Sequence, residues 1–247
     1  MKSSNETVVR SSGSDRVLVI MAKAPRLGEV KTRLTPSLSP AAVTAFYCCL
    51  LDDTLALARS LKLKLSDVEV AIMCPDSDVN ELAQLAGNET SVVAQKGEGL
   101  AAGLTSVFAH FVEGHQRRII AFNSDSPHLP RSVLEDAFET LAAHDVVVGP
   151  THDGGYYLVG AKAFHPTLFA HDGMGTNSAL ERLLSRAQAL ELSVGFADPF
   201  YDIDVADDLT RLAAELRLAP AKAPRTAVWL EEWGHAVARL RTGTGEL

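Results

Sequence analysis

The sequence predicts an α/β protein with a mostly parallel central sheet and helices on both faces. Three observations support this fold class. Apolar, strand-like runs alternate with helix-like segments from residue 16 to about residue 215. Several of these runs are apolar throughout, as strands buried between two helix layers are. Polar clusters follow several of the runs, at the positions where open parallel sheets bind ligands.

Seven segments read as strands, and they are RVLVIMA (16–22), DVEVAIMC (67–74), SVVAQ (91–95), RRIIAFNSD (117–125), DVVVGP (145–150), GYYLVGA (155–161) and ELSVGFA (191–197). Helical spacing of apolar residues predicts six helices between and after them, over 39–61, 78–86, 99–112, 132–143, 178–190 and 205–218. Ser39 as N-cap and Pro40 at the first helical position mark the start of the longest one.

Both ends of the chain differ from the alternating region, so we expect a domain over 16–218. Residues 1–15 are polar and Ser-rich and lack the apolar centre of a signal peptide, which predicts a disordered tail on a cytoplasmic protein. Residues 219–247 read as a Pro-containing linker (219–225) and an amphipathic helix (227–240) with Trp229 and Trp233 one turn apart. That helix either folds back on the domain or binds a partner.

Composition excludes several classes of protein. The formal net charge of −8 argues against a protein that coats nucleic acid. No stretch approaches the unbroken apolar run of about 18 residues that a membrane span needs. The three cysteines, Cys48, Cys49 and Cys74, are odd in number and lack metal-site spacing, so we expect reduced thiols in a reducing compartment. The local basicity of residues 26–33 is therefore a feature of a site.

The first polar cluster is MAKAPRLGEVKTRL (21–34), directly after the first strand. Gly28 permits close backbone approach, while Lys31 and Arg33 are the residue types that grip a phosphate cluster. The segment is neither a Walker loop nor a GxGxxG loop. The alternative is a solvated basic loop that precedes a helix.

The second cluster, NSDSPHLP (123–130), follows the strand IIAF. Asp125 at the mouth of a parallel strand is well placed for Mg²⁺, which takes one or two carboxylates together with substrate phosphates and water. The alternative is an Asp that caps a helix in a Pro turn. In the third cluster, THDGGYY (151–157), Asp153 could bind a substrate hydroxyl or act as a base, although a tight turn explains the glycine pair equally well.

The fourth cluster, YDIDVADD (201–208), places Asp202 and Asp204 on one face of an extended segment. Two carboxylates on one face repel each other unless a cation or hydrogen-bond donors offset their charge, which makes a second metal ligand plausible here. Asp207 and Asp208 fit the first turn of the following helix, where they face its dipole. The histidines form no HxxxH or HxH pair and there is no GxSxG elbow, so neither a zinc site nor a Ser hydrolase is expected.

The order of these four clusters resembles that of the GT-A-type transferases known as radical-SAM/selenodomain-associated transferases, a glycosyltransferase-like group. The chain is also similar, more distantly, to the 2-phospho-lactate guanylyltransferases. The shared pattern covers roughly residues 16 to 215 and includes MAKAPRLGEVKTRL, NSDSPHLP, GPTHDGGYYLVG and FYDIDVADDL. The resemblance implies a Rossmann-like GT-A, nucleotide-diphospho-sugar transferase fold.

The resemblance also implies roles for individual residues. The nucleotide and its phosphates would be bound by Ala22, Lys23, Gly28, Lys31 and Arg33. Asp125 and Asp204 would hold Mg²⁺ or Mn²⁺, and Asp125, Lys31 and Asp153 would take part in catalysis. Gly154, Gly155 and Tyr156 would lie, with Asp153, on the acceptor side.

This chain departs from the family pattern at three places. Gly175, Thr176 and Asn177 stand where the family has Trp-Ser-Thr, which puts the identity of the acceptor in doubt. Val205 replaces a Thr in the closing motif, and Asn123 stands where Gly or Ala is commoner.

Three functions follow from these residues. The first is glycosyl transfer from a nucleotide sugar to a small-molecule acceptor, which the resemblance favours. The second is nucleotidyl transfer from an NTP to a phosphorylated acceptor with release of pyrophosphate, which the paired cations Lys31 and Arg33 favour. The third is a non-catalytic nucleotide-binding module. The expected partners are thus a nucleotide and a small acceptor, without nucleic acid or membrane, and a homo-oligomer remains open.

Overall fold

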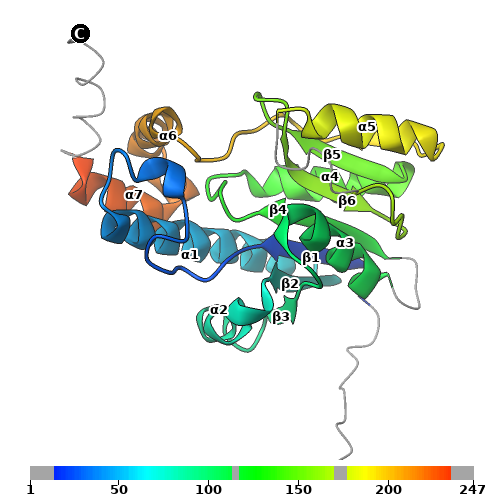
Figure 1. Cartoon of the computed structure of the whole chain (residues 1–247), viewed down its shortest axis with the longest axis horizontal. Coiled ribbons are helices and arrows are strands. Elements are labelled where there is room, and N and C mark those ends of the chain that lie inside the picture. The colour runs from blue at the N-terminus through cyan, green and yellow to red at the C-terminus, as the bar shows by residue number, and fades with distance from the viewer. Residues whose placement is uncertain (1–13, 113–116, 170–176, 235–247) are drawn as a thin grey trace, which may run out of the picture.

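The computed structural model describes residues 14–112, 117–169 and 177–234. Within them, seven strands form one sheet in the order β3-β2-β1-β4-β6-β5-β7 (Figure 1). The strands are β1 (Arg16–Met21), β2 (Val68–Cys74), β3 (Ser91–Ala94), β4 (Arg118–Asn123), β5 (Val146–Pro150), β6 (Tyr156–Ala161) and β7 (Val194–Phe196). The α-helices are α1 (Pro40–Lys64), α2 (Val79–Ala86), α3 (Gly99–Phe111), α4 (Arg131–Ala143), α5 (Ala179–Ala189), α6 (Ala206–Leu218) and α7 (Pro224–Glu232). Three short 3₁₀ helices are η1 (Thr32–Leu34), η2 (Asp76–Asp78) and η3 (Pro220–Lys222).

The sheet is mostly parallel, as predicted. β1 lies between β2 and β4 and pairs in parallel with both, so that Leu18 faces Val70 on one side and Ile120 on the other. β6 is the exception, because it runs antiparallel between β4 and β5. The carboxyl ends of the other strands therefore lie at one edge of the sheet, and the loop that joins β5 to β6 lies at that edge as well.

Helices cover both faces of the sheet (Figure 1). Apolar residues of α1, α2 and α4 pack on one face around Ile20, Ile72 and Phe122. Residues of α3 and α5 pack on the other face around Val19 and Val148. The inner strands carry apolar side chains on both faces because helices cover both of them. This is the predicted arrangement of a sheet between two helix layers.

The longest helix, α1, is long and apolar enough to cross a membrane by length and composition alone. Its most apolar window is 56% buried inside the protein, and its residues belong to two of the hydrophobic cores. Core helices share this composition, so the helix is weak evidence for a membrane span. Its interruption by Asp52 and Asp53 agrees with the absence of an unbroken apolar run in the sequence.

The C-terminal segment packs against α1 and α6. Trp229 of α7 is buried against Phe46 of α1, with ring centroids 4.8 Å apart. The carboxylate of Asp53, also buried, accepts hydrogen bonds from the backbone N–H groups of Arg225 (3.1 Å) and Thr226 (2.8 Å) at the start of α7. The helix expected over 227–240 thus begins at Pro224, inside the segment predicted to be a linker. Residues 235–240, like residues 1–13 of the predicted tail, lie outside the described residues.

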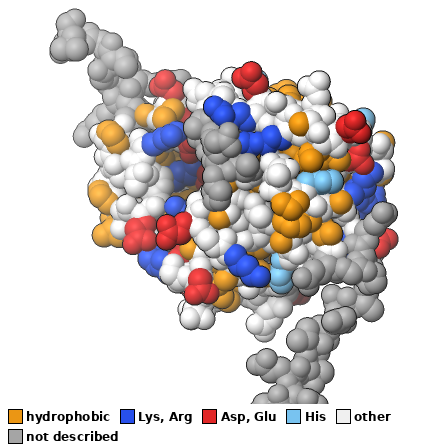
Figure 2. All heavy atoms as spheres, turned by 45° about the vertical axis from the view of Figure 1, so that its right-hand side comes forward, with side chains coloured by type: hydrophobic (Ala, Val, Ile, Leu, Met, Phe, Trp, Pro, Cys, Tyr) orange, Lys and Arg blue, Asp and Glu red, His pale blue; other side chains and the backbone are white. Residues whose placement is uncertain are grey.

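The side of the molecule that lies to the right in Figure 1 is shown in Figure 2. On this face, Lys and Arg side chains are interspersed with acidic and hydrophobic ones (Figure 2). Three basic residues, Lys23, Lys31 and Arg33, lie at the edge formed by the carboxyl ends of the strands.

Candidate active site

A cleft of about 900 Å³ opens at the carboxyl edge of the sheet, beside the ends of β1, β2 and β4. Its volume lies in the range of small-molecule sites. It is lined by six of the residues that the sequence analysis selected, which are Ala22, Lys23, Lys31, Arg33, Asp125 and Asp204. The structure thus brings together residues that lie up to 182 positions apart, from Ala22 to Asp204, and does so where parallel sheets bind their ligands.

Arg26 fixes the loop after β1 to η2, the short helix that follows β2. The guanidinium of Arg26 contacts the carboxylate of Asp78 at 2.6 Å, and the other Asp78 oxygen accepts the N–H of Ala24 at 2.9 Å. Burial opposes ionisation of Asp78, but the hydrogen bonds from Ala24, Ser77 and Arg26 outweigh it and lower its pKa. Arg26 is therefore a structural cation. Gly28, with φ +77°, provides a turn that other residues rarely adopt, and it does not line the cleft.

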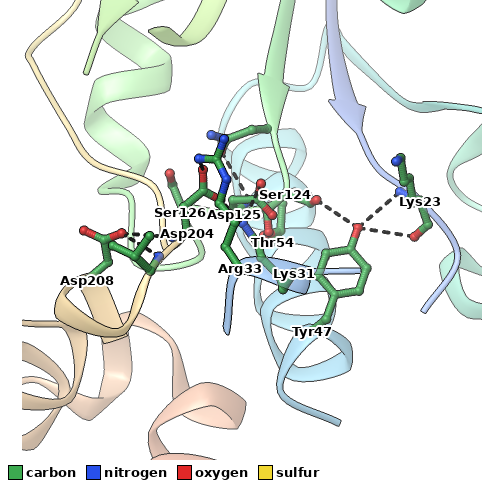
Figure 3. Close-up of polar contacts among 12 residues, drawn as sticks. Lys23, Lys31, Arg33, Tyr47, Thr54, Ser124, Asp125, Ser126, Asp204 and Asp208 are labelled. Atoms are coloured by element: carbon green, nitrogen blue, oxygen red, sulfur yellow. Dashed lines mark hydrogen bonds and ion pairs between the residues drawn. The ribbon is translucent and has the colours of Figure 1, made fainter. Parts of the chain in front are cut away.

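Lys31 lies between the two predicted metal ligands. Its Nζ is 2.8 Å from Asp125 Oδ2 and 2.7 Å from Asp204 Oδ1, and its side chain is only 5% exposed (Figure 3). Burial lowers the pKa of Lys31, but the charges of Asp125 and Asp204 reverse this effect and the pKa is raised. Lys31 stays charged. The sequence analysis assigned Lys31 to the phosphates of the nucleotide, whereas in the structure it is in direct contact with both carboxylates.

Arg33 extends the same cluster toward solvent. Its guanidinium NH1 is 3.6 Å from Asp204 Oδ2, and its side chain is 70% exposed. Lys23 is exposed as well and lines the cleft. Among the described residues, Lys23 and Arg33 are therefore the cations of the cleft whose charged groups remain accessible to a ligand.

The two carboxylate-bearing segments are joined to each other. The N–H of Ile203 donates to the carbonyl of Asp125 at 3.0 Å, and the hydroxyl of Ser126 donates to the carbonyl of Tyr201 at 3.0 Å. The carboxylate of Asp208, in the first turn of α6 as predicted, accepts the N–H of Asp204 at 3.0 Å. These bonds hold Asp125 and Asp204 side by side although they belong to different elements.

Asp202 lies near the same cluster but does not line the cleft. Burial, followed by the negative charge of Asp204, raises the pKa of Asp202 to about 6. A carboxylate of this kind adds negative charge near the cluster in a pH-dependent way.

The structure also places Tyr47 in the cleft, which the sequence analysis missed. Its hydroxyl accepts the N–H of Lys23 at 3.1 Å and lies 3.2 Å from the Lys23 carbonyl and 3.1 Å from Ser124 Oγ (Figure 3). Burial raises the pKa of Tyr47 to about 12, so the hydroxyl keeps its proton. Tyr47 thus ties the loop after β1 to the residue that precedes Asp125. At its helical spacing it reads as an ordinary core aromatic, so no sequence signal distinguishes it.

A second missed element is the loop that leads into α3. Gly97 and Gly99 have φ of +85° and +81°, and the side-chain amide of Gln95 donates to the carbonyl of Gly97 at 2.9 Å. All three residues line the cleft, so the first turn of α3 faces it. A helix start exposes free backbone N–H groups, which suit an anion or polar ligand groups. In the sequence, Gly97 and Gly99 at the start of the predicted helix were the signal that could have indicated this loop.

The third cluster forms a turn outside the lining of the cleft. Asp153 Oδ1 accepts hydrogen bonds from the Thr151 hydroxyl and from the N–H of Gly155 at 3.2 Å. The hydrogen bond from Thr151 is the largest cause of a lowered pKa at Asp153. Gly154 has φ +87°, and a Cβ there would collide with the carbonyl of Asn177. A tight turn is therefore enough to explain the glycine pair. Tyr156 follows this turn as the first residue of β6.

The cluster suits a hard divalent cation that is shared with a substrate. Asp125 and Asp204 converge closely enough to contact one ammonium group. Among the described residues, no group of three or more His, Cys, Asp or Glu side chains surrounds a common point. Mg²⁺ or Mn²⁺ fits such a pair because one or two carboxylates, completed by phosphates and waters, are sufficient for it.

The fold is similar to those of solved proteins described as nucleotide-diphospho-sugar transferases and nucleotidyltransferases. A candidate nucleotide-diphospho-sugar transferase from Desulfovibrio desulfuricans G20 superposes with a TM-score of 0.80, at 24% identity over 92% of this chain and 98% of that one. A nucleotidyl transferase from Methanothermobacter thermautotroptrophicus gives 0.56, at 17% identity over 83% of this chain and 100% of that one. The 4-diphosphocytidyl-2C-methyl-D-erythritol synthase of Anaerococcus prevotii DSM 20548 also gives 0.56, at 11% identity, over 82% and 96%.

Residues 57–176 match the model of a family described as "Uncharacterized protein conserved in bacteria (DUF2064)". No curated protein matches the sequence. The predicted GT-A fold class is thus confirmed by the structural likeness, and the matched segment contains Asp125 and the Asp153 turn.

Proposed function

We propose that the protein is a metal-dependent transferase that uses a nucleotide sugar as donor and a small molecule as acceptor. The observation that carries this proposal is the contact of Asp125, Lys31 and Asp204 in the cleft at the carboxyl edge of the sheet. The fold is that of nucleotide-sugar transferases and nucleotidyltransferases, which supports the donor class. The likeness in motif order to the selenodomain-associated transferases supports the same donor.

The cleft offers each part of a donor a chemically suitable surface. Asp125 and Asp204 would hold Mg²⁺ or Mn²⁺, which when bound offsets the negative charge of the leaving diphosphate. Lys23 and Arg33 would contact the phosphate oxygens, and Ala22 supplies backbone beside them. The turn at Gly97 and Gly99 also lines the cleft, and the nucleoside would sit against it.

In this proposal the residues of the chain bind, orient and stabilise charge. As the bond to the donor sugar breaks, negative charge grows on the diphosphate, and cations already in place stabilise it without rearrangement. Tyr47 and Arg26 hold the loop that carries Lys23. The turn of Asp153, Gly154 and Gly155, together with Tyr156, lies outside the cleft lining and would face the acceptor.

One observation favours a diphosphate donor over a triphosphate. The sequence analysis counted the Lys31 and Arg33 pair in favour of an NTP. In the structure, the charge of Lys31 is shared by two carboxylates. Fewer cations are therefore left for the phosphates, which suits the smaller charge of a nucleotide sugar. Nucleotidyl transfer with release of pyrophosphate is the second candidate, because the fold is common to both activities.

Product analysis separates these functions. The protein with Mn²⁺ is incubated with a panel of NDP-sugars and NTPs, each with a set of sugar, alcohol and phosphorylated acceptors, and NDP and pyrophosphate are measured. We expect release of NDP from an NDP-sugar. Release of pyrophosphate alone would establish the nucleotidyl reaction instead, and nucleotide binding without turnover of any donor would favour the non-catalytic module.

The Asp125→Asn and Asp204→Asn variants should each lose turnover by at least about a hundredfold, since each removes one of two carboxylate ligands. Asp136→Asn, an exposed Asp on α4, is the matched control and should leave turnover unchanged. Full activity in both cleft variants would exclude the proposed metal site.

A further inference from the structure

Lys31 is held in place on the carboxylate pair by its own backbone. It adopts the left-handed conformation, φ 46° and ψ 40°, at the residue that precedes η1. The next turn is closed by the bond from Leu34 N–H to the Lys31 carbonyl at 2.9 Å. The Lys31 side chain is only 5% exposed. It is therefore held within the site and does not project freely toward a substrate.

The ammonium group of Lys31 contacts one oxygen of each carboxylate. Its Nζ is paired with Asp125 Oδ2 and Asp204 Oδ1, while Asp204 Oδ2 faces Arg33 at 3.6 Å. One positive charge thus offsets part of the negative charge of the pair. A divalent cation that approaches these oxygens is repelled by the ammonium group at the same time as it is attracted by the carboxylates.

The positive charge of Lys31 and the small number of carboxylate ligands both weaken the binding of a free divalent cation. Two carboxylates are too few to complete the coordination of Mg²⁺ or Mn²⁺, and Lys31 weakens their pull further. Phosphate oxygens would supply both the missing ligands and the missing negative charge. A metal that arrives with a nucleotide therefore meets a complete site, whereas a free metal does not.

We infer that Lys31 suppresses the binding of a free divalent cation, so that the metal enters the site together with the phosphates of the nucleotide. This inference rests on the proposed function, because it concerns the same metal site. It gives Lys31 a role in ordering the ligands, which differs from direct contact with the phosphates.

The test measures Mn²⁺ binding by electron paramagnetic resonance, with the metal alone and with ADP, CDP, GDP or UDP. Lys31→Met removes the charge and keeps a side chain of similar length. Lys31→Asn is the second neutral variant, since Asn tolerates a left-handed backbone. Lys64→Met, at an exposed position in the last turn of α1, is the matched control. Thermal unfolding verifies that each variant is folded.

We expect wild-type protein to bind free Mn²⁺ weakly, and to bind it at least about tenfold more tightly with the preferred nucleoside diphosphate. Both neutral Lys31 variants should bind free Mn²⁺ about tenfold more tightly than wild type, because a repulsive charge at about 4 Å is lost. By thermodynamic linkage, the factor by which a nucleoside diphosphate tightens Mn²⁺ binding should be smaller in the same variants. The Lys64 variant should behave as wild type.

Unchanged or weaker binding of free Mn²⁺ in both neutral Lys31 variants would overturn the inference. So would wild-type protein that binds Mn²⁺ equally well with and without nucleotide. Failure of the proposed function looks different, because Asp125→Asn would then bind Mn²⁺ and nucleoside diphosphate as wild type does.

Discussion

Replacement of Tyr47 by Phe tests whether the loop after β1 is held in place for binding. The hydroxyl accepts the N–H of Lys23 at 3.1 Å, and its own proton goes to the Lys23 carbonyl or to Ser124 Oγ. Phe retains the packing of the ring in the core but leaves these buried or partly buried polar groups without their partner. Loss of such a partner costs about 1–3 kcal/mol, of which about 1 kcal/mol would appear as weaker nucleotide binding. This corresponds to a roughly fivefold rise in Kd.

Two assays separate binding from stability in this variant. Isothermal titration with Mn²⁺ and a nucleoside diphosphate gives Kd, and urea unfolding gives the free energy of unfolding. Tyr157→Phe is the matched control, because its hydroxyl donates to the Asp198 carbonyl at 2.8 Å away from the cleft. It should lose about 1 kcal/mol of stability and keep its Kd. Equal Kd values for Tyr47→Phe and wild type would refute the positioning role of the hydroxyl.

Two further predictions concern stability. Asp53→Ala should lower the free energy of unfolding by about 1–2 kcal/mol in urea titrations, because the start of α7 loses its acceptor, and Asp53→Asn should lose less; equal stability of the Ala variant would show that this cap is dispensable. His128 is buried against Phe200 and Tyr201, and burial lowers its pKa to about 4. Below the unfolded-state pKa of about 6.5 the unfolded chain binds a proton that the folded protein excludes, so stability falls as the pH drops from about 6.5 toward 4. His128→Gln should flatten this part of the stability curve, and an unchanged slope would contradict the assignment.

The sheet could be predicted from sequence because its strands are apolar on both faces. A run such as RVLVIM can only be buried between two layers, and the helices between such runs supply those layers. The antiparallel direction of β6 was not predicted, although the sequence contains a signal for it. Residues 151–155, between β5 and β6, are too few for the crossover that a parallel neighbour needs, so they indicate a hairpin.

The C-terminal helix was harder to place. Its sequence predicts an apolar stripe, but the helix begins earlier than expected because Pro224 takes the first helical position after the short 3₁₀ turn. The acceptor for its first N–H groups is Asp53, which lies on another helix far away in the chain. A cap that comes from such a distance leaves no local pattern.

The candidate site, too, could be predicted from sequence only in part. Asp125 and Asp204 were accessible because they follow strand and precede helix, positions that meet at one edge of a parallel sheet. The position of Lys31 between them was not accessible, since the Lys31–Asp204 contact joins residues 173 positions apart and depends on the turn before η1. The sequence indicates which charges gather in the cleft, but only the fold decides which of them already neutralise one another.

The central claim is that Asp125 and Asp204 hold a metal that binds the phosphates of a nucleotide. Its most direct test is the affinity of wild-type protein, Asp125→Asn and Asp204→Asn for ADP, CDP, GDP and UDP, measured by isothermal titration with and without Mn²⁺. The account predicts that wild-type protein binds one of these nucleotides at least about tenfold more tightly with Mn²⁺, and that both variants lose this gain. The same affinity with and without Mn²⁺ in wild type, or a full gain in both variants, would contradict it.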